Sequence, residues 1–232
     1  MKKTSIILAA FGAATLSIAQ ADLITAFTFE ALSDPVPLTI TSEFGPNVGT
    51  IYLDGQFGSS VFNPATGTGR ELDDFGGTIV GDPRPNLVAG TATAGDSLSL
   101  LNSTANGKSI VLQVSTVGFF DISLSFASQR TTTGFNNNSL QYSTDGITFT
   151  SFETGFVPAA SFALKTFDLS AISEIENQPA VYFQYTVTGA TSASGNNRLD
   201  NIVVTGVPEP GTFVALLSGL GMLGLVRRRR LA

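Results

Sequence analysis

The 232-residue chain contains no cysteine, no histidine and no tryptophan. Without cysteine it can form no disulfide, thiol nucleophile or thiolate metal site. Without histidine it lacks the usual general base at neutral pH, every Ser-His-Asp triad and every zinc site that needs imidazole. Without tryptophan, only tyrosine and phenylalanine rings can stack on a sugar. The composition leaves open carboxylate chemistry, as in glycoside hydrolysis, and an oxygen-ligand Ca²⁺ site.

The first 21 residues predict a signal peptide, which is removed from the mature protein. Lys2-Lys3 forms a basic start, residues 6–18 are mostly apolar, and Ala19-Gln20-Ala21 is an A-x-A cleavage site. Cleavage after this site would leave Asp22 as the first residue of an exported protein.

The last 26 residues consist of three parts in sequence. Val207-Pro208-Glu209-Pro210 is an extended peptide, because each proline fixes its own φ and lacks a backbone donor. Residues 212–226 are almost entirely apolar and predict a transmembrane helix about 22 Å long, shorter than the hydrocarbon core of roughly 30 Å. Arg227-Arg228-Arg229-Arg230 follows directly. Clustered arginines stay on the cytoplasmic side, which leaves the preceding chain outside.

This tail resembles the PEP-CTERM sorting signal of Gram-negative bacteria, in which a Pro-Glu-Pro motif, a short apolar span and a basic end occur in this order. The resemblance implies recognition by exosortase, a membrane-embedded transpeptidase-like enzyme that cuts near the motif. It also implies that the protein crosses the inner membrane, is transiently anchored by residues 212–226, and then reaches the cell surface or an exopolysaccharide matrix. An ordinary single-pass anchor is the alternative.

Residues 22–206 form the body of the chain and suffice for one domain with a single hydrophobic core. The body holds six of the 12 basic residues and 17 of the 18 acidic residues, a net charge of about −11. A surface of this charge repels the phosphates of nucleic acids and anionic lipids. We therefore expect no nucleic-acid partner, whereas divalent cations and neutral glycans are compatible partners.

Short apolar runs with a period of two predict an all-β body of ten strands. In Asp121–Phe126 the apolar residues face one way and the polar residues the other, which is typical of a half-buried antiparallel strand. Asp145-Gly146 predicts a tight hairpin turn and Ser170–Asn177 a helical turn. This pattern favours an antiparallel two-sheet sandwich of the jelly-roll kind. The predicted strands cover residues 24–29, 49–53, 98–101, 110–114, 119–126, 140–143, 147–152, 164–169, 181–187 and 199–205.

Several segments of the body resemble the galactose-binding-like jelly-roll domains that often precede PEP-CTERM tails. The segments are Phe75–Thr78, Ala127–Phe135, Gln141–Gly146 with Phe149, and Asn197–Ile202. The resemblance implies a fold similar to that of carbohydrate-binding modules. It does not identify a ligand, because one fold serves many functions.

Two acidic segments are candidates for chemistry. Asp200 and Asn201 lie on the last predicted strand, where their oxygens could join backbone carbonyls in a Ca²⁺ shell; the alternative is a hydrogen-bonding pair at a strand edge. No other metal or cofactor is predicted. Glu71 and Asp73-Asp74 place three carboxylates close together, and we expect them to form a solvated acidic loop.

A third candidate is a glycan-binding loop. Arg130, Phe135 and Asn136 supply a planar donor fork, a ring and an amide that could dock on the hydroxyl groups and the apolar face of a sugar. Tyr142, beside the predicted hairpin turn, is the best placed tyrosine for stacking. The alternatives are a turn-rich loop for the first three residues and cross-strand packing for Tyr142.

The leading hypothesis is an exported, non-catalytic surface or matrix protein that exosortase processes and that binds glycan. The second is an enzyme that acts on polysaccharide with carboxylates alone, which requires two of them about 5 to 10 Å apart in a groove. The third is a purely structural envelope protein. The sequence predicts no catalytic residue for the leading hypothesis.

Overall fold

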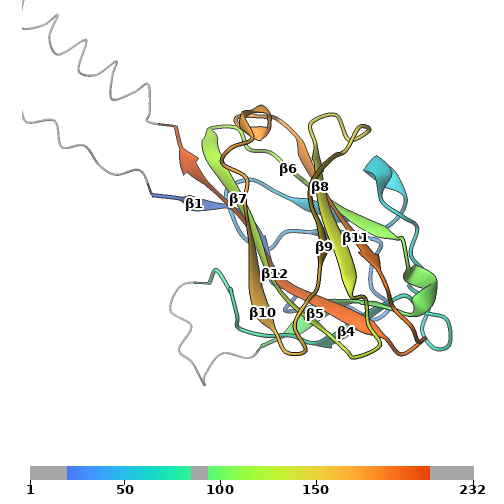
Figure 1. The fold of residues 1–232 in the computed structure, drawn as a ribbon. Coiled ribbons are helices and arrows are strands. Elements are labelled where there is room, and N and C mark those ends of the chain that lie inside the picture. Colours follow the sequence, from blue (N-terminus) through green and yellow to red (C-terminus); the bar gives the residue numbers. More distant parts are fainter. Residues whose placement is uncertain (1–19, 85–93, 210–232) are drawn as a thin grey trace, which may run out of the picture.

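A computed structural model describes residues 20–84 and 94–209, which form one all-β sandwich (Figure 1). Three short 3₁₀ helices connect strands: η1 (Gln56–Gly58), η2 (Ser103–Ala105) and η3 (Ser173–Ile175). The strands are β1 (Asp22–Phe27), β2 (Thr39–Thr41), β3 (Thr50–Tyr52), β4 (Leu72–Gly76), β5 (Asp96–Leu101), β6 (Ser109–Val114), β7 (Phe119–Arg130), β8 (Asn137–Ser143), β9 (Thr150–Phe156), β10 (Ala163–Asp168), β11 (Val181–Thr188) and β12 (Asn196–Pro208).

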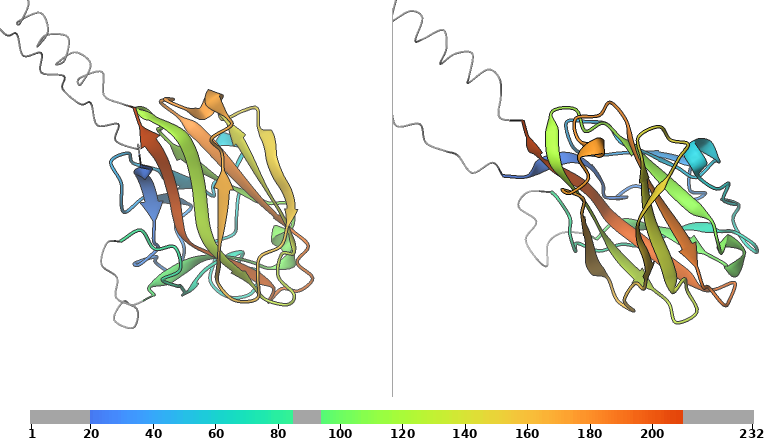
Figure 2. Two further views of the ribbon diagram at one scale, coloured as in Figure 1. Left: turned by 60° about the vertical axis from the view of Figure 1, so that its left-hand side comes forward. Right: turned by 45° about the horizontal axis from the view of Figure 1, so that its top comes forward.

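The strands form two antiparallel sheets that pack face to face, as the two views in Figure 2 show. Sheet A has the order β10-β7-β12-β5-β4, and β1 also pairs with β12. Sheet B has the order β2-β3-β6-β11-β8-β9. The long strand β12 lies inside sheet A, with β7 on one side and first β5, then β1, on the other. The predicted fold class is confirmed.

The core lies between the sheets because alternate side chains of each strand point inward. Phe126 of β7 meets Tyr185 of β11 edge to face across this layer, with ring centroids 5.5 Å apart. The inward residues of the two strands, all buried, are Ile122, Leu124, Phe126, Val181, Phe183, Tyr185 and Val187. The period-two pattern in the sequence therefore identifies the core face correctly.

Each of the ten predicted strands has a counterpart, but β2 and β4 were not predicted. Strand β4 contains Asp73-Asp74, which the sequence assigns to a solvated loop. That assignment is wrong, because Glu71 and Asp73 are only 4% and 3% exposed. Ion pairs with Lys108 and Arg70, respectively, compensate the two buried carboxylates.

The hairpin between β8 and β9 forms, but the tight turn predicted at Asp145-Gly146 is wrong in its length. Strand β8 ends at Ser143 and β9 begins at Thr150, which leaves a six-residue connection. The Asp145 carboxylate accepts backbone N–H bonds from Ile147 and Thr148, each 2.8 Å long. These bonds satisfy backbone N–H groups of the loop, which then need no partner on the neighbouring strand. Strand β9 therefore begins later than predicted.

The predicted helical turn at Ser170–Asn177 contains η3, and Asp168 accepts a hydrogen bond from the Ser170 backbone just before it. In residues 20–84 and 94–209, no helix is long and apolar enough to span a membrane. The predicted helix at residues 212–226, the arginine cluster and most of the predicted signal peptide lie outside the described residues. Asp22, the predicted mature N-terminus, is the first residue of β1.

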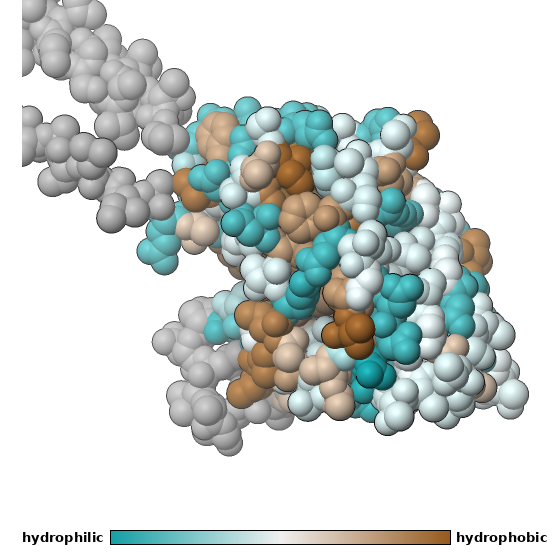
Figure 3. All heavy atoms as spheres, viewed as in Figure 1, coloured by the Kyte–Doolittle hydropathy of each residue, from teal (hydrophilic) through white to brown (hydrophobic). Residues whose placement is uncertain are grey.

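The face of the molecule in Figure 3 carries both hydrophilic and hydrophobic side chains, and the hydrophobic ones lie in small groups. Several exposed large hydrophobic residues lie outside strands, among them Val48, Val61, Val117, Ile147 and Val157. Isolated exposed apolar residues are normal on the surface of a folded domain. This face therefore gives no indication of a large apolar docking surface.

Candidate functional site

Asp200 and Asn201 lie at the point where β12 changes its neighbour. Residues 196–199 pair with β5, and residues 202–206 pair with β1. The ladder to β7 shifts register after Asp200, and Asn201 adopts a left-handed backbone with φ of 49°. This bulge turns both side chains toward the gap between β5 and β1.

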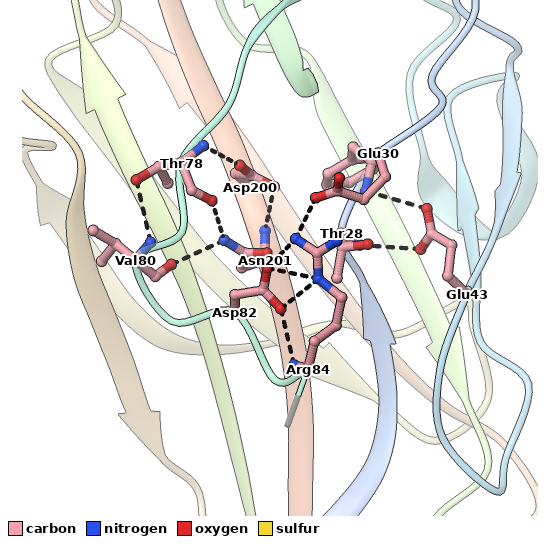
Figure 4. Close-up of polar contacts among 10 residues, drawn as sticks. Thr28, Glu30, Glu43, Thr78, Val80, Asp82, Arg84, Asp200 and Asn201 are labelled. Atoms are coloured by element: carbon pink, nitrogen blue, oxygen red, sulfur yellow. Dashed lines mark hydrogen bonds and ion pairs between the residues drawn. The ribbon is translucent and has the colours of Figure 1, made fainter. Parts of the chain in front are cut away.

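The two side chains hold the segment from Thr78 to Val80 in that gap (Figure 4). The Asp200 carboxylate accepts N–H bonds from Thr78 at 2.6 Å and from Asn201 at 2.7 Å. The Asn201 amide donates to the carbonyls of Thr78 and Val80 at 2.7 and 3.0 Å. We call these four residues the β12 clasp. It joins positions more than 120 residues apart in the sequence.

Burial dominates the electrostatics of the clasp. Asp200 has no exposed surface, and this burial raises its pKa to about 8, against the lowering effect of the two N–H bonds. Glu30 and Asp82 raise it further through charge repulsion. The Arg84 guanidinium donates to Glu30 at 2.7 Å and also pairs with Asp82 (Figure 4). The positive charge of Arg84 is therefore directed at these two carboxylates rather than at Asp200.

The clasp only partly fits a calcium shell. The Asn201 side-chain oxygen is buried without a hydrogen-bond partner, as a metal ligand would be before the ion binds. However, Ca²⁺ takes six to eight oxygens, and each Asp200 oxygen already accepts an N–H bond. The described residues contain one group of three carboxylates with oxygens within 4.8 Å, and it lies elsewhere, at Asp34 and Asp73-Asp74.

The predicted glycan-binding loop does not form a single site. Phe135 lies in the core with no exposed surface, so its ring is not available to a ligand. Arg130 donates from Nε to the Pro158 carbonyl at 3.1 Å and from Nη1 to the Thr131 carbonyl at 3.2 Å. Asn136 is exposed and fills the space beside Gly189, where a Cβ atom would meet its Oδ1 at 2.0 Å. These contacts correspond to the structural alternative for the loop.

Tyr142 lies on sheet B, whereas Arg130 ends a strand of sheet A. Its half-buried ring packs against the core, and a hydrogen bond with Glu174 raises the pKa of its hydroxyl group. Tyr142 lies opposite Phe183 of β11 and, together with Glu174, lines a small pocket beside η3, so its role in ligand binding stays a prediction.

An aromatic cluster that the sequence did not predict covers part of the outer face of sheet B. The Phe57 ring lies 5.0 Å from that of Tyr52 and 4.9 Å from that of Tyr182. The polar groups around it pair with one another: the Tyr52 hydroxyl donates to Gln113, and the Gln184 amide donates to the Gly58 carbonyl. This part of the face is therefore covered by its own side chains.

The end of β12 extends two residues past the predicted body. Val207 and Pro208 pair with Phe120 and Phe119 of β7, and the Glu209 N–H donates to the Gly118 carbonyl at 2.9 Å. The other edge of β12 pairs with β1, so that Asp22 lies opposite Gly206. Both ends of the described chain consequently leave the sandwich on the same side, as Figure 1 shows.

Residues 206–230 match the family of the PEP-CTERM protein-sorting motif. The chain carries a PEP-CTERM sorting motif. The match begins in the last rungs of β12 and covers all three parts of the tail that the sequence distinguishes. The PEP-CTERM motif indicates an exported protein. A search of curated protein sequences finds no significant match.

Several solved structures match this chain at low similarity. The K3 adhesin domain of Lys-gingipain from Porphyromonas gingivalis w83 is 12% identical, with 80% of this chain and 99% of that chain covered at a TM-score of 0.41. The xylan-binding module CBM15 is 10% identical, with 53% and 90% covered at a TM-score of 0.39. TmCBM61, solved with beta-1,4-galactotriose, is 12% identical, with 47% and 69% covered at a TM-score of 0.32. At these values the similarity assigns no ligand or activity to this chain.

Proposed function

We propose that the protein is exported, processed by exosortase at its PEP-CTERM motif and delivered to the cell surface or extracellular matrix, where the β-sandwich binds glycan without catalysing a reaction. The PEP-CTERM match at residues 206–230 carries the sorting part of this proposal. The excess of carboxylates over basic residues in the body favours neutral glycans over nucleic acids and anionic lipids.

The geometry of the termini supports this delivery route. Because β1 and the end of β12 are neighbours, a signal peptide before Asp22 and a membrane segment after Gly211 would approach the sandwich from one side. Only Pro210-Gly211 separates Glu209, hydrogen-bonded to the body, from the apolar run that starts at Thr212. The body would therefore sit directly on the membrane surface before processing.

The pairing of acidic side chains favours a non-catalytic role. A glycosidase needs one carboxylate free to donate a proton and a second free to act as base or nucleophile. Five of the 17 acidic residues of the body, Glu30, Glu71, Asp73, Asp82 and Glu153, are each ion-paired with a lysine or arginine. Asp200 has a suitably raised pKa, but it has no exposed surface to offer a substrate. A carboxylate enzyme remains the alternative, and hydrolysis of polysaccharide by the purified protein would establish it.

Calcium binding at the β12 clasp is a prediction within this proposal. If the ion binds Asp200 and Asn201, millimolar CaCl₂ raises the melting temperature of the protein, because a ligand that binds only the folded state stabilises it. Asn201→Ala would abolish that increase. An unchanged melting temperature in CaCl₂ would contradict calcium binding and leave the clasp with a hydrogen-bonding role alone.

The deciding experiment for sorting is intact mass spectrometry of the protein from its native host, with and without exosortase. We expect the loss of both ends and a new C-terminus within residues 208–211 only when exosortase is present. A full-length tail retained in the inner membrane in both strains would overturn the proposal and favour a plain anchored protein. A glycan array then tests ligand binding, and a featureless array would favour the purely structural alternative.

A further inference from the structure

A pocket of about 360 Å³ opens on the outer face of sheet A, at the end where β12 begins. This volume is within the range of about 300–1,000 Å³ found for small-molecule sites. The pocket lies between the loop that precedes β4 and the loop that precedes β12. Its polar and aromatic lining includes Thr68, Arg70, Phe75, Asn102, Ser194 and Asn196.

The sheet beside this pocket carries polar groups without partners. Asp73, Ser99 and Arg198 lie side by side across three strands, and they alternate with core leucines, so they face outward. Asn196 is two residues before Arg198 and shares its face. Among the described residues, nine buried side-chain polar atoms lack a hydrogen-bond partner, and four of them belong to this group: Asp73 Oδ2, Ser99 Oγ, Asn196 Oδ1 and Arg198 Nε.

Four unpaired polar atoms in one small group require an explanation, because buried polar groups in native proteins are almost always hydrogen-bonded. Asp73 Oδ2 faces the Arg70 guanidinium in an ion pair, so its charge is compensated. Ser99, Asn196 and Arg198 have no comparable partner for the atoms named. Of these three residues Asn196 lines the pocket, where a hydroxyl group of a ligand could donate the missing hydrogen bond to its Oδ1.

Arg70 and Phe75 line the pocket, and Arg198, which does not line it, also packs against the Phe75 ring. The guanidinium carbons of Arg198 and Arg70 are 4.8 and 5.9 Å from the centre of the Phe75 ring. Arg198 has no ion pair with a carboxylate, and Nη1 donates to the Gly76 carbonyl at 3.2 Å. Among the six basic residues of the body, all within the described part of the chain, Arg130 and Arg198 form no ion pair with a carboxylate. Neither lines the pocket, but Arg198 packs on the lining residue Phe75.

One unpaired atom at the pocket indicates the chemical class of ligand. Asn196 lines the pocket, and its Oδ1 is a hydrogen-bond acceptor. An anion can only accept hydrogen bonds, whereas a hydroxyl group both donates and accepts. The negative charge of Asp73 acts on Arg198 and would repel an anion bound nearby. The net negative charge of the body opposes an anionic ligand as well.

We propose that this pocket is the glycan-binding site and that it takes a neutral sugar through its hydroxyl groups. The inference rests on the glycan-binding function proposed above, and it assigns that function to sheet A rather than to the loop after Arg130. Asn196 begins β12 and the sorting motif begins at Gly206, so about 33 Å of extended strand separates the pocket from the motif. The pocket opens at the end of the sandwich away from the predicted membrane side.

The test uses the full-length protein in detergent micelles on an array of neutral gluco-, galacto-, manno- and xylo-oligosaccharides, with hexuronic acid oligosaccharides of equal length beside them. Arg198→Met removes the guanidinium that packs on the lining residue Phe75 but keeps a side chain of similar reach. Thr68→Trp fills the mouth of the pocket from an exposed loop position and leaves the sheet intact. Arg130→Met, the same change at the other unpaired arginine, is the matched control.

We expect binding to a neutral oligosaccharide, weakened at least tenfold by both pocket variants and unchanged in the Arg130→Met control. If Arg198→Met fails to fold, Thr68→Trp alone decides. Glycan binding that survives both pocket variants would overturn this inference while leaving the proposed function intact. Preference for the uronic acid oligosaccharides would overturn the ligand class. Binding to no oligosaccharide would overturn the glycan-binding part of the proposed function together with this site.

Discussion

At the scale of single residues, burial and hydrogen bonding determine the pKa values of the candidate polar side chains. Asp200 and Asp145 illustrate the contrast. Burial raises the pKa of Asp200 to about 8, whereas N–H bonds from Thr148 and Ile147 lower the pKa of the exposed Asp145 to about 2. Sequence context alone does not distinguish these two aspartates, because the difference comes from which backbone groups and how much solvent surround each one.

The Asp200 pKa predicts how stability depends on pH. The folded pKa of about 8 lies above the unfolded value of about 3.9, so between these values the folded state binds the proton more tightly. The contribution of Asp200 to the free energy of unfolding therefore decreases as pH rises from about 4 to about 8, by at most about 1.4 kcal/mol per pH unit. Asp200→Asn should flatten this slope in urea denaturation series at pH 5, 6, 7 and 8.

Asn provides only one acceptor, so Asp200→Asn should also lower stability at pH 5 by about 1–2 kcal/mol. Asp145→Asn is the matched control. The lowered pKa of Asp145 places its titration below pH 4, so its substitution leaves the slope between pH 5 and 8 unchanged. An Asp200→Asn protein with the wild-type slope would show that Asp200 does not titrate in this range.

Phe135 provides a second test at this scale. Its ring has no exposed surface and belongs to the core, so Phe135→Ala should lower the free energy of unfolding by about 3–5 kcal/mol. Phe152→Ala, at a ring that is 36% exposed, should cost less than half as much. Thermal unfolding of both variants measures the difference. Equal losses would mean that Phe135 is not packed as described.

At the scale of the element, β12 connects the ligand pocket, the clasp and the sorting motif. The strand is 13 residues long and pairs along most of its length with β7. Its last residues, Val207 and Pro208, are both part of sheet A and part of the PEP-CTERM motif. An enzyme that binds this motif as an extended peptide has to compete with the β7 ladder for it.

Moving the motif out of the sheet should therefore accelerate processing. Insertion of Gly-Ser-Gly-Ser after Gly206 lets the inserted residues take the place opposite Phe119-Phe120 and leaves the motif unchanged but unpaired. We expect faster appearance of the processed form in pulse-chase experiments in a host with exosortase. The same insertion between Ala160 and Ser161, in an exposed loop, is the control. Equal rates would show that release of β12 does not limit processing.

At the scale of the whole molecule, charge and topology act together. The body has 17 acidic and six basic residues, and four of the basic residues form ion pairs with nearby carboxylates. The remaining carboxylates repel one another over the surface, which opposes the compact state. The sandwich tolerates this because its stability comes from the apolar layer between the sheets, not from surface charge.

Salt should accordingly stabilise the protein. Raising NaCl from 20 to 500 mM shortens the screening length from about 20 Å to about 4 Å and weakens the repulsion more than the few close ion pairs. At pH 7.5 we expect the melting temperature to rise by about 2–4 °C, equivalent to roughly 1 kcal/mol. The increase should largely vanish at pH 4, where many carboxylates are protonated. A lower melting temperature in salt would mean that the ion pairs outweigh the net repulsion.

The sequence by itself determined the sorting tail, the fold class and most strands. These features are local: proline, apolar length and clustered arginine act over a few residues, and the alternation in Asp121–Phe126 or Val181–Val187 identifies a core face directly. The short strand β2 has only three residues of pattern, and β4 carries acidic residues whose burial depends on distant partners.

Only the tertiary structure decided where ligands could bind. Asp73, Ser99 and Arg198 become neighbours through strand register, and Asp200 reaches Thr78 because β12 exchanges β5 for β1 at that point. Phe135 becomes a core residue rather than a ligand platform for the same reason. Contacts between residues so far apart depend on the packing of the entire sandwich, and no local pattern of residues encodes them.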